Sequence, residues 1–292
     1  MFKSIRLLRP VTRIQPIFNS RWLNTSAVSA EKDVYLEMLD GSSKGIAVLN
    51  LNRPKAKNAI SVKFLQEFRE ALKEARFSSE VPRVLILNSL VDGVFCAGAD
   101  LKERAGMSPP QVTEFLYNLR QAYRELETLP IPTIAVIDGA ALGGGLEMAL
   151  SCDLRVAGAK AKIGLPETRL AIIPGAGGTQ RLPRLIGSAK AKELIFTSAT
   201  LTAQGAFECG IVNYATEESS YPKALSLAES MLPQGPIAMR MAKMAIDKGL
   251  QADIDTGLEI EQAYYAQVIP TEDRMEGLMA FREKRAPVYK GK

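Results

Sequence analysis

The chain has 292 residues, of which 47% are apolar and 24% charged, and this composition is typical of a globular protein. No run of about 18 or more apolar residues occurs, which excludes an apolar membrane-spanning helix. The absence of histidine excludes Ser-His-Asp and Cys-His catalysis, histidine metal ligands and proton transfer by imidazole. The three cysteines fit neither a disulfide framework nor the spacing of a metal site.

The net charge of +5 comes entirely from the first 30 residues, which contain five basic side chains and no acidic one. The rest of the chain holds 32 basic and 32 acidic residues, so the charge does not indicate nucleic-acid binding. An arginine-rich, serine-containing N-terminus without acids is typical of a mitochondrial transit peptide, and we expect one over residues 1–30 of a matrix protein. A disordered basic tail is the alternative.

Strands and helices alternate in the first part of the sequence. A turn-rich connection joins the first two apolar segments, which we expect to form a hairpin. Ser61 is placed to cap the first helix, and Ser108 with two prolines opens the second, which closes before Pro130. This alternation predicts an α/β fold with a mostly parallel sheet and crossover helices. Expected strands cover 34–39, 46–51, 83–88, 131–139, 153–158 and 161–165, and expected helices cover 61–77 and 108–129.

From about Gly178 the sequence becomes helical. Three longer helices are expected after Ser219, and the last of them begins near Thr271. The sequence thus predicts an α/β core over 31–215 and a helical C-terminal region over 216–292. Shorter helices are expected at 179–187, 188–198 and 202–210, and the apolar side of the last helix would consist of Met275, Leu278, Met279 and Phe281.

Three glycine-bearing segments lie at expected strand ends, over residues 94–103, 139–147 and 172–180. They match neither the phosphate-binding P-loop nor the dinucleotide pattern, and generic glycine turns are the alternative. Glycines at a helix N-terminus leave backbone N–H groups bare, where these groups can stabilise negative charge. Two loops that each direct one N–H at the same oxygen would form an oxyanion hole for an enolate growing on a thioester carbonyl.

Two glutamates stand close to these glycines in the sequence. Glu147 lies one helical turn after three glycines and among apolar neighbours, and Glu167 lies in a loop after an expected strand. A buried carboxylate is costly unless it has a partner or a function, although most glutamates are surface charges. Two carboxylates in different environments can supply one base and one acid.

Four motifs carry a resemblance to a known family. They are FCAGADLKE (95–103), IDGAALGGGLEMALSCDLRVA (137–157), GLPETRLAIIPGAGGTQRLPRLIG (164–187) and EGLMAFREKR (276–285). With these motifs, the sequence resembles the enoyl-CoA hydratase/isomerase (crotonase) family over about residues 34–290. This resemblance implies a crotonase-like spiral of ββα units with a C-terminal helical trimerisation region, assembled as a homotrimer or a dimer of trimers. It also implies a coenzyme A thioester substrate, with no metal and no further cofactor.

The resemblance implies roles for particular residues. Ala97 and Gly144 match the two oxyanion-hole positions, and Glu147 and Glu167 match the two catalytic glutamates. Glu147 would help to activate a water, and Glu167 would act as the acid toward C2. Contacts with coenzyme A are expected from Arg53, Lys55, Ala56, Lys57, Gly98, Asp100, Leu101 and Lys284, the last of them often across subunits, and the substrate pocket is expected to include Lys102, Arg104 and Pro166.

The presence of both glutamates favours a hydratase, which adds water across the C2–C3 double bond of a 2-enoyl-CoA, over an isomerase. The acyl group stays open between 3-methylglutaconyl-CoA, whose distal carboxylate needs a cation such as Arg104 or Lys102, and a short-chain 2-enoyl-CoA. RNA binding with little catalysis is the alternative from another class, but in residues 61–80 acidic and basic side chains alternate, which is typical of a solvated helix face. A protease of related fold would need the missing histidine.

Overall fold

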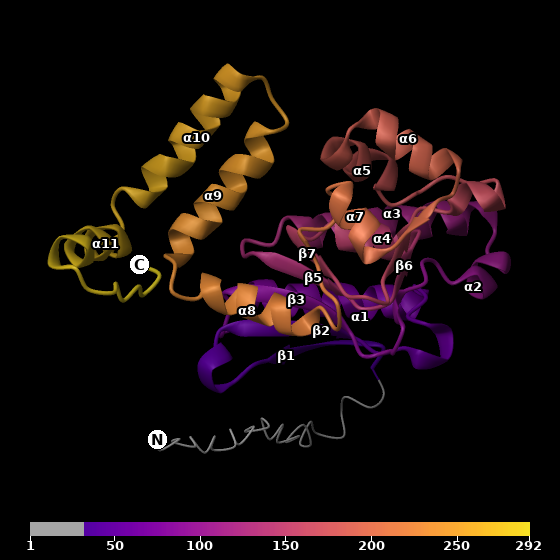
Figure 1. Ribbon diagram of the computed structural model, residues 1–292, viewed down its shortest axis with the longest axis horizontal. Helices are drawn as coiled ribbons and strands as arrows, with labels where there is room; N and C mark the ends of the chain where they lie inside the picture. Colours follow the sequence, from indigo (N-terminus) through magenta and orange to yellow (C-terminus); the bar gives the residue numbers. More distant parts are fainter. Residues whose placement is uncertain (1–31) are drawn as a thin grey trace, which may run out of the picture. The chain divides into compact units, whose positions relative to one another are not determined.

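The computed structural model describes residues 32–292, which form one compact unit (Figure 1). The transit peptide expected over residues 1–30 lies outside the described residues. Within the described part, no helix is both long enough and apolar enough to cross a membrane.

The larger sheet of residues 32–292 has six strands in the order β1-β2-β3-β5-β7-β10. β1 and β2 are antiparallel and form the expected hairpin, with a short 3-10 turn, η2 (Gly41–Ser43), between them. All other neighbouring strands of this sheet are parallel, as the alternation of strands and helices predicted. The strands are β1 (Val34–Met38), β2 (Ile46–Leu51), β3 (Val84–Ser89), β5 (Thr133–Ile137), β7 (Leu154–Ala157) and β10 (Tyr214–Ala215).

A second, smaller sheet lies beside the larger one and has the order β4-β6-β8-β9. Of its strands, the sequence predicted only β8 (Lys162–Gly164), because β4 (Val94–Cys96) and β6 (Ala140–Leu142) fall within glycine-bearing segments that read as loops. The chain alternates between the sheets: β3, β5 and β7 belong to the larger one, and β4, β6 and β8 to the smaller one. This repetition is the predicted spiral of ββα units. The last strand, β9 (Thr200–Leu201), runs antiparallel to β8.

Alternate residues of the larger sheet point to opposite faces, and both faces are covered by helices. One face packs on α1 (Val62–Phe77) and α3 (Pro109–Glu127), and the other packs on α8 (Tyr221–Met231). The hydroxyl of Ser61 accepts the N–H of Phe64 and begins α1 as predicted. The remaining helices before residue 216 are α2 (Leu101–Ala105), α4 (Gly144–Leu150), α5 (Gly178–Ile186), α6 (Ser188–Phe196) and α7 (Ala203–Glu208).

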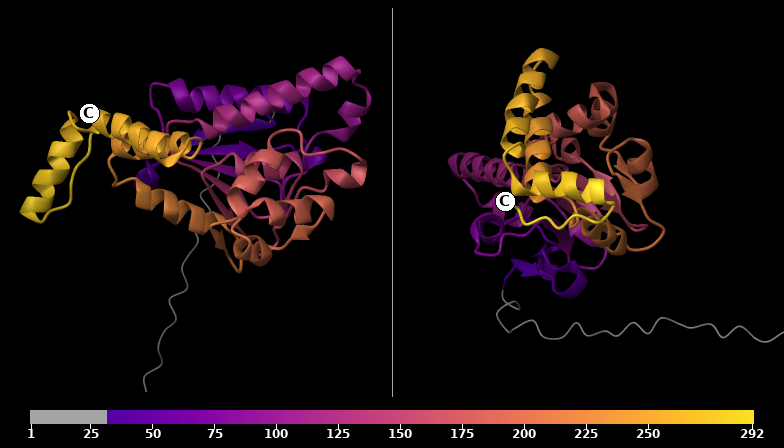
Figure 2. Two further views of the ribbon diagram at one scale, coloured as in Figure 1. Left: turned by 90° about the horizontal axis from the view of Figure 1, so that it is seen from above. Right: turned by 90° about the vertical axis from the view of Figure 1, so that its left-hand side faces the viewer.

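Residues 216–292 contain four helices, one more than the three that the sequence predicted. The chain breaks between α8 and α9 (Pro236–Gly249), where Gly235 and Pro236 start a new helix. Because α8 covers the larger sheet, only α9, α10 (Ile254–Val268) and α11 (Glu272–Glu283) extend beyond the core (Figures 1 and 2). α11 begins after Thr271 as expected, but its predicted apolar side is exposed in the single chain, at Met275, Leu278, Met279 and Phe281.

Candidate active site

The three glycine-bearing segments meet around one cavity of about 810 Å³. Its walls come from the chain after β4, from the turn between β6 and α4, from the long connection between β8 and α5, and from α3. Both predicted catalytic glutamates, Glu147 and Glu167, line this cavity, as does Gly144. The lining also includes Ala97, Gly98, Leu101, Arg104 and Pro166 of the predicted site.

Glu147 lies in the first turn of α4, and only 2% of its surface is exposed. Its Oε1 accepts two backbone hydrogen bonds, from the N–H of Ala176 at 2.8 Å and from the N–H of Gly178 at 2.7 Å. No group of residues 32–292 donates to its other oxygen, Oε2. Burial raises the pKa of Glu147, and the two N–H donors, Arg181 and Arg120 oppose that rise. The carboxylate is therefore fixed through one oxygen and free to act through the other.

Glu167 is the first residue of the 3-10 turn η4 (Glu167–Leu170), which follows β8, and it lines the same cavity as Glu147. Its Oε2 is buried and has no hydrogen-bond partner in residues 32–292. Burial, and then the charge of Glu147, raises the pKa of Glu167 to about 7. A Cβ at Gly143 would lie 3.1 Å from Oε1 of Glu167, so the glycine turn and this carboxyl group are neighbours. At neutral pH, Glu167 therefore keeps a proton more readily than an ordinary glutamate does.

Two backbone N–H groups face the cavity beside these carboxyl groups. The N–H of Gly144 is the first of α4 and has no partner within the helix. The N–H of Ala99 has no partner in residues 32–292. The carbonyl oxygen of Gly98 and the N–H of Asp100 make the two hydrogen bonds of the bridge to Ile60, so the N–H of Ala99 points away from Ile60. A Cβ at Gly144 would lie 3.6 Å from the nitrogen of Ala99, so the two donors are close together. They form a pair suited to one oxygen.

The structure corrects one residue of the predicted pair of donors. Ala97 was expected to supply an N–H, but its N–H donates to the carbonyl oxygen of Lys57 at 3.1 Å and is not available. Ala99, two residues further along, has an N–H without a partner in residues 32–292. The sequence could not reveal this, because the direction of an N–H along residues 97–99 depends on the bridge to Ile60. The hydroxyl of Tyr123 donates to the carbonyl oxygen of Gly144 at 2.6 Å and so helps to hold the turn that carries the N–H of Gly144.

Several residues that were expected to contact coenzyme A have other partners in the single chain. The guanidinium of Arg53 lies 2.8 Å from Asp100 and 2.6 Å from the carbonyl oxygen of Ala59, so it ties the loop around η3 (Pro54–Ala56) to the start of α2. Asp100 also caps α2 by accepting the N–H groups of Lys102 and Glu103. The cavity lining does not include Arg53, Lys55, Ala56, Lys57, Asp100 or Lys284, and their contacts with coenzyme A stay predictions. Lys102, which was expected in the substrate pocket, also lies outside this lining.

Sequence reasoning missed the contribution of α3 to the cavity. Leu116, Leu119 and Arg120 line it from one face of that helix. Their spacing of three and four residues could have indicated a common face, but not which hollow that face meets. Arg120 acts electrostatically on Glu147, and Arg104 lies 6.0 Å from the ring centre of Phe115. Two cations therefore border a cavity that holds two carboxyl groups.

Comparisons with known proteins agree with this geometry. The sequence pattern of a family described as enoyl-CoA hydratase/isomerase matches residues 41–292. The chain belongs to the enoyl-CoA hydratase/isomerase family. It is 51% identical to the human mitochondrial methylglutaconyl-CoA hydratase over 275 residues, covering 91% of this chain and 80% of the relative. It is 46% identical to the human mitochondrial enoyl-CoA hydratase domain-containing protein 2 over 297 residues, covering all of both chains.

Solved structures give the same result for the fold. A crystal structure of enoyl-CoA hydratase from Bacillus anthracis is similar with a TM-score of 0.84 and 45% identity, covering 89% of this chain and 100% of that one. The family resemblance, the crotonase fold and the expectation of an enzyme are thereby confirmed. In residues 32–292, no cluster of three or more histidine, cysteine or acidic side chains is arranged to hold a metal ion.

Proposed function

We propose that this enzyme adds water across the C2–C3 double bond of a 2-enoyl-CoA thioester. The observation that carries the proposal is the pair of carboxyl groups on one cavity. Glu147 is anchored by two N–H donors, while Glu167 has an unpartnered oxygen and a pKa raised to about 7. Two such groups with different proton affinities are what a base and an acid require near neutral pH.

The geometry supports the following reaction. The thioester oxygen accepts the N–H groups of Ala99 and Gly144, which stabilise the enolate as it forms. Glu147 takes a proton from the bound water through Oε2, and the oxygen of that water bonds to C3. The electron pair of the double bond moves toward the thioester, and Glu167 then gives its proton to C2. Proton exchange with solvent returns both glutamates to their starting states, so no cofactor beyond the coenzyme A of the substrate is needed.

For the acyl group we propose 3-methylglutaconyl-CoA, with a short-chain 2-enoyl-CoA as the alternative. Methylglutaconyl-CoA hydratases are among the relatives that the chain matches at 51% identity. Arg104 and Arg120 line the cavity and form no ion pair with any group of residues 32–292, so either can meet a distal carboxylate. Lys102, the other cation expected from the sequence, is exposed and lies outside the lining.

The test compares kcat/KM for 3-methylglutaconyl-CoA and crotonyl-CoA in the wild type and in Arg120→Met. A charge-assisted hydrogen bond is worth about 1.5–3 kcal/mol, so the variant should lose roughly ten- to a hundredfold with the dicarboxylic substrate alone. Arg69→Met, on the neighbouring helix α1 and outside the cavity lining, is the control. Equal losses with both substrates would mean that Arg120 does not recognise the distal carboxylate.

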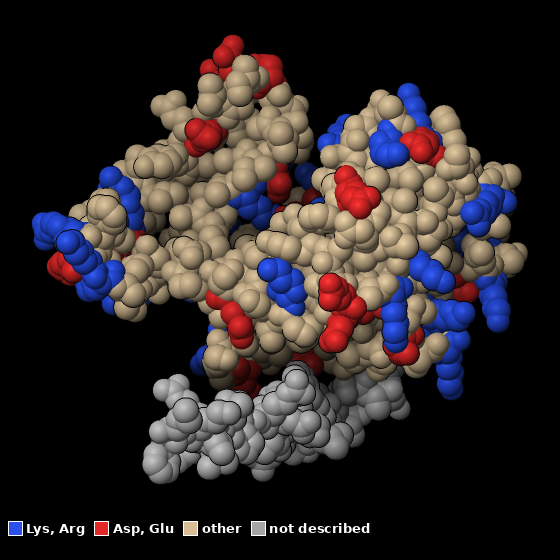
Figure 3. Space-filling view, viewed as in Figure 1, with Lys and Arg blue, Asp and Glu red and all other residues tan. Residues whose placement is uncertain are grey.

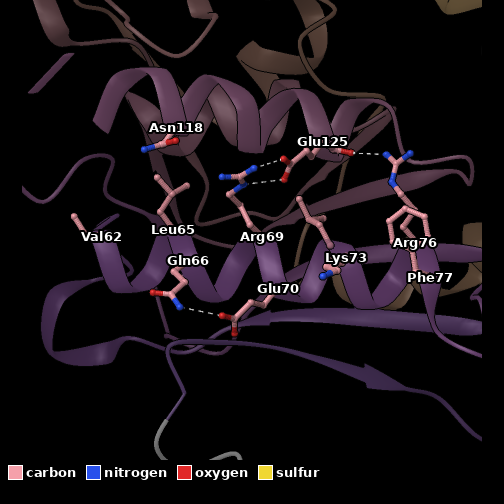
Figure 4. A pocket seen from close by; sticks show the side chains of 11 residues that line it. Val62, Leu65, Gln66, Arg69, Glu70, Lys73, Arg76, Phe77, Asn118 and Glu125 are labelled. Carbon is pink, nitrogen blue, oxygen red and sulfur yellow. Dashed lines mark hydrogen bonds and ion pairs between the residues drawn. The ribbon is translucent and has the colours of Figure 1, made fainter. Parts of the chain in front are cut away.

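RNA binding receives little support from the face that the sequence singled out. α1 and α3 enclose a groove of about 590 Å³, drawn in Figure 4. There Arg69 pairs with Glu125 at 2.5 Å, and Arg76 donates to the carbonyl oxygen of Glu125 at 3.1 Å. The face of the molecule shown in Figure 3 likewise carries Lys and Arg interspersed with Asp and Glu. Binding to phosphates needs an excess of positive charge, so we propose that RNA binding is weak.

We also propose a location and an assembly. Several relatives carry "mitochondrial" in their names, which supports a transit peptide over residues 1–30 and a place in the matrix. The extension of α9–α11 supports a homotrimer or a dimer of trimers, because it exposes apolar side chains that a partner would cover. Among these are Ile246, Leu250, Ile254, Leu258, Tyr265 and Phe281.

A further inference from the structure

Arg181 is the most elaborately bonded side chain near the cavity that the proposed reaction does not use. It lies in the first turn of α5 and is mostly buried, with 16% of its side chain exposed. Its Nε and Nη2 each donate to one carboxylate oxygen of Glu127 at 3.0 Å, at the end of α3. Its Nη1 donates to the carbonyl oxygen of Ala176 at 3.0 Å. Arg181 therefore joins α3 to the loop in front of α5.

That loop is the one that holds Glu147. The backbone of Ala176 makes both links: its N–H donates to Glu147, and its carbonyl oxygen accepts from Arg181. The next residue, Gly177, has a φ of +114°, and a Cβ there would lie 2.1 Å from Nη1 of Arg181. Glycine is needed because the backbone lies directly against the guanidinium. The loop whose N–H groups donate to Glu147 is thus held by Arg181, and Arg181 is held by Glu127.

The remaining partners keep Arg181 in place. Arg124 donates to Glu127 at 2.7 Å from the preceding turn of α3, so this carboxylate is shared by two guanidinium groups. Burial alone would raise the pKa of Glu127. The hydrogen bond and charge of Arg181, and then those of Arg124, hold this pKa below its usual value. Paired, two-bond contacts between Arg and carboxylate fix geometry as well as charge.

We infer that Arg181 is a positioning residue for the proposed hydration: it anchors the two backbone donors of Glu147 to the end of α3 and supplies a positive charge near that carboxylate. The inference rests on the proposed role of Glu147 as the base. The other ionisable groups that interact with Glu147 are Glu167 from η4 and Arg120 and Tyr123 from α3. None of these three touches the loop over residues 176–178 through a side-chain hydrogen bond.

The test measures kcat, KM and their pH dependence with crotonyl-CoA in the full chain. Arg181→Met should lower kcat by about ten- to a hundredfold, because small displacements of a catalytic group have effects of that size, with KM within about twofold. The acidic limb of the kcat profile should move up by at least roughly half a pH unit, because the base loses a favourable charge. Arg184→Met, exposed on the same helix, is the matched control and should leave kcat and the profile unchanged.

Two further variants separate positioning from charge. Arg181→Lys keeps the charge but not the three-way hydrogen bonding, so kcat should fall while the acidic limb stays in place. Glu127→Gln removes the countercharge of Arg181, so the limb should stay or move down and never up. A loss of stability and kcat in Arg181→Met without any movement of the limb would overturn the inference, as would wild-type kcat in Arg181→Lys. Wild-type turnover in Glu147→Gln would instead overturn the proposed function itself.

Discussion

Two hollows lie on either side of α3, and they differ in how their polar groups are satisfied. In the groove between α1 and α3, Arg69 pairs with Glu125, and Gln66 donates to Glu70 (Figure 4). In the cavity, by contrast, the N–H of Ala99 and Oε2 of Glu167 have no partner in residues 32–292. Both hollows are large, so size does not distinguish them. Unsatisfied buried groups are costly, and an enzyme retains them where a substrate will satisfy them.

Removing the carboxyl groups should give the largest effect and test this difference directly. Glu147→Gln and Glu167→Gln should each lower the hydration rate by about 10²–10⁴-fold, the contribution of a positioned acid or base. The double variant should lose less than the product of the two, since both groups serve one addition reaction. Steady-state kinetics with crotonyl-CoA, after a circular dichroism check of folding, measures this.

The matched control is Glu125→Gln, which removes a carboxylate of α3 that lines the groove and not the cavity. Its rate should equal that of the wild type. If Glu167→Gln were equally active, Glu167 would have no part in the reaction, and an unsatisfied oxygen would not mark a catalytic group in this molecule.

The backbone donors should come next in size. Gly144→Pro deletes one N–H and should cost about 3 kcal/mol of transition-state stabilisation, or roughly a hundredfold in kcat. Replacing Ala99 by lactic acid, which turns its amide into an ester, removes the other N–H without adding a ring and should have a similar effect. The same replacement at Ala97 is the control, because that N–H already bonds Lys57. It should lower stability and leave kcat nearly unchanged, and the reverse outcome would restore Ala97 as the donor.

Sequence and structure agree best where the signal is local. Ser61 begins α1 through its own hydroxyl, and Glu147 is buried one turn after the glycines, as the spacing predicted. The hairpin and the other strands of the larger sheet, apart from the two-residue β10, were long enough to show their apolar pattern. These features depend on residues a few positions apart, so a sequence contains them in full.

The parts that could not be predicted depend on contacts between distant segments. Strands of three residues, such as β4 and β6, exist because they pair with each other rather than because of their composition. Which N–H faces the cavity depends on Ile60, about 40 residues before Ala99. The place of Arg120 in the lining depends on how α3 packs, and the break before α9 interrupts a helical pattern that reads as continuous.

Stability should respond to pH through Glu167. A carboxyl group with a raised pKa in the folded state binds its proton more tightly there than in the unfolded chain, where its usual value is about 4.3. Its contribution is therefore zero below about pH 4 and becomes increasingly unfavourable until the pH passes about 7. Glu167→Gln removes that penalty. After allowance for partial exposure, it should stabilise the protein by about 1–2 kcal/mol at pH 8 and by nothing at pH 4.

Urea unfolding of the wild type and Glu167→Gln at both pH values measures the difference. A variant less stable than the wild type at pH 8 would mean that this carboxyl group is satisfied in the folded protein. An unsatisfied carboxyl group would then no longer distinguish the cavity from the groove. Activity gives an independent reading: hydration by the wild type should decline as the pH rises through about 7, because Glu167 loses the proton it donates.

The smallest effect is expected in the groove. The side chains of Arg69 and Glu125 are 41% and 38% exposed, and exposed ion pairs contribute about 0–1 kcal/mol. Arg69→Met should therefore shift the unfolding free energy by less than about 1 kcal/mol and leave kcat unchanged. It should also leave RNA retention by residues 31–292 unchanged at low and at physiological salt, because a guanidinium already paired with a carboxylate adds no excess charge for a phosphate to neutralise. A marked, salt-sensitive loss of RNA retention would show that the pair opens to bind phosphate, and that satisfied groups in this molecule can also serve a function.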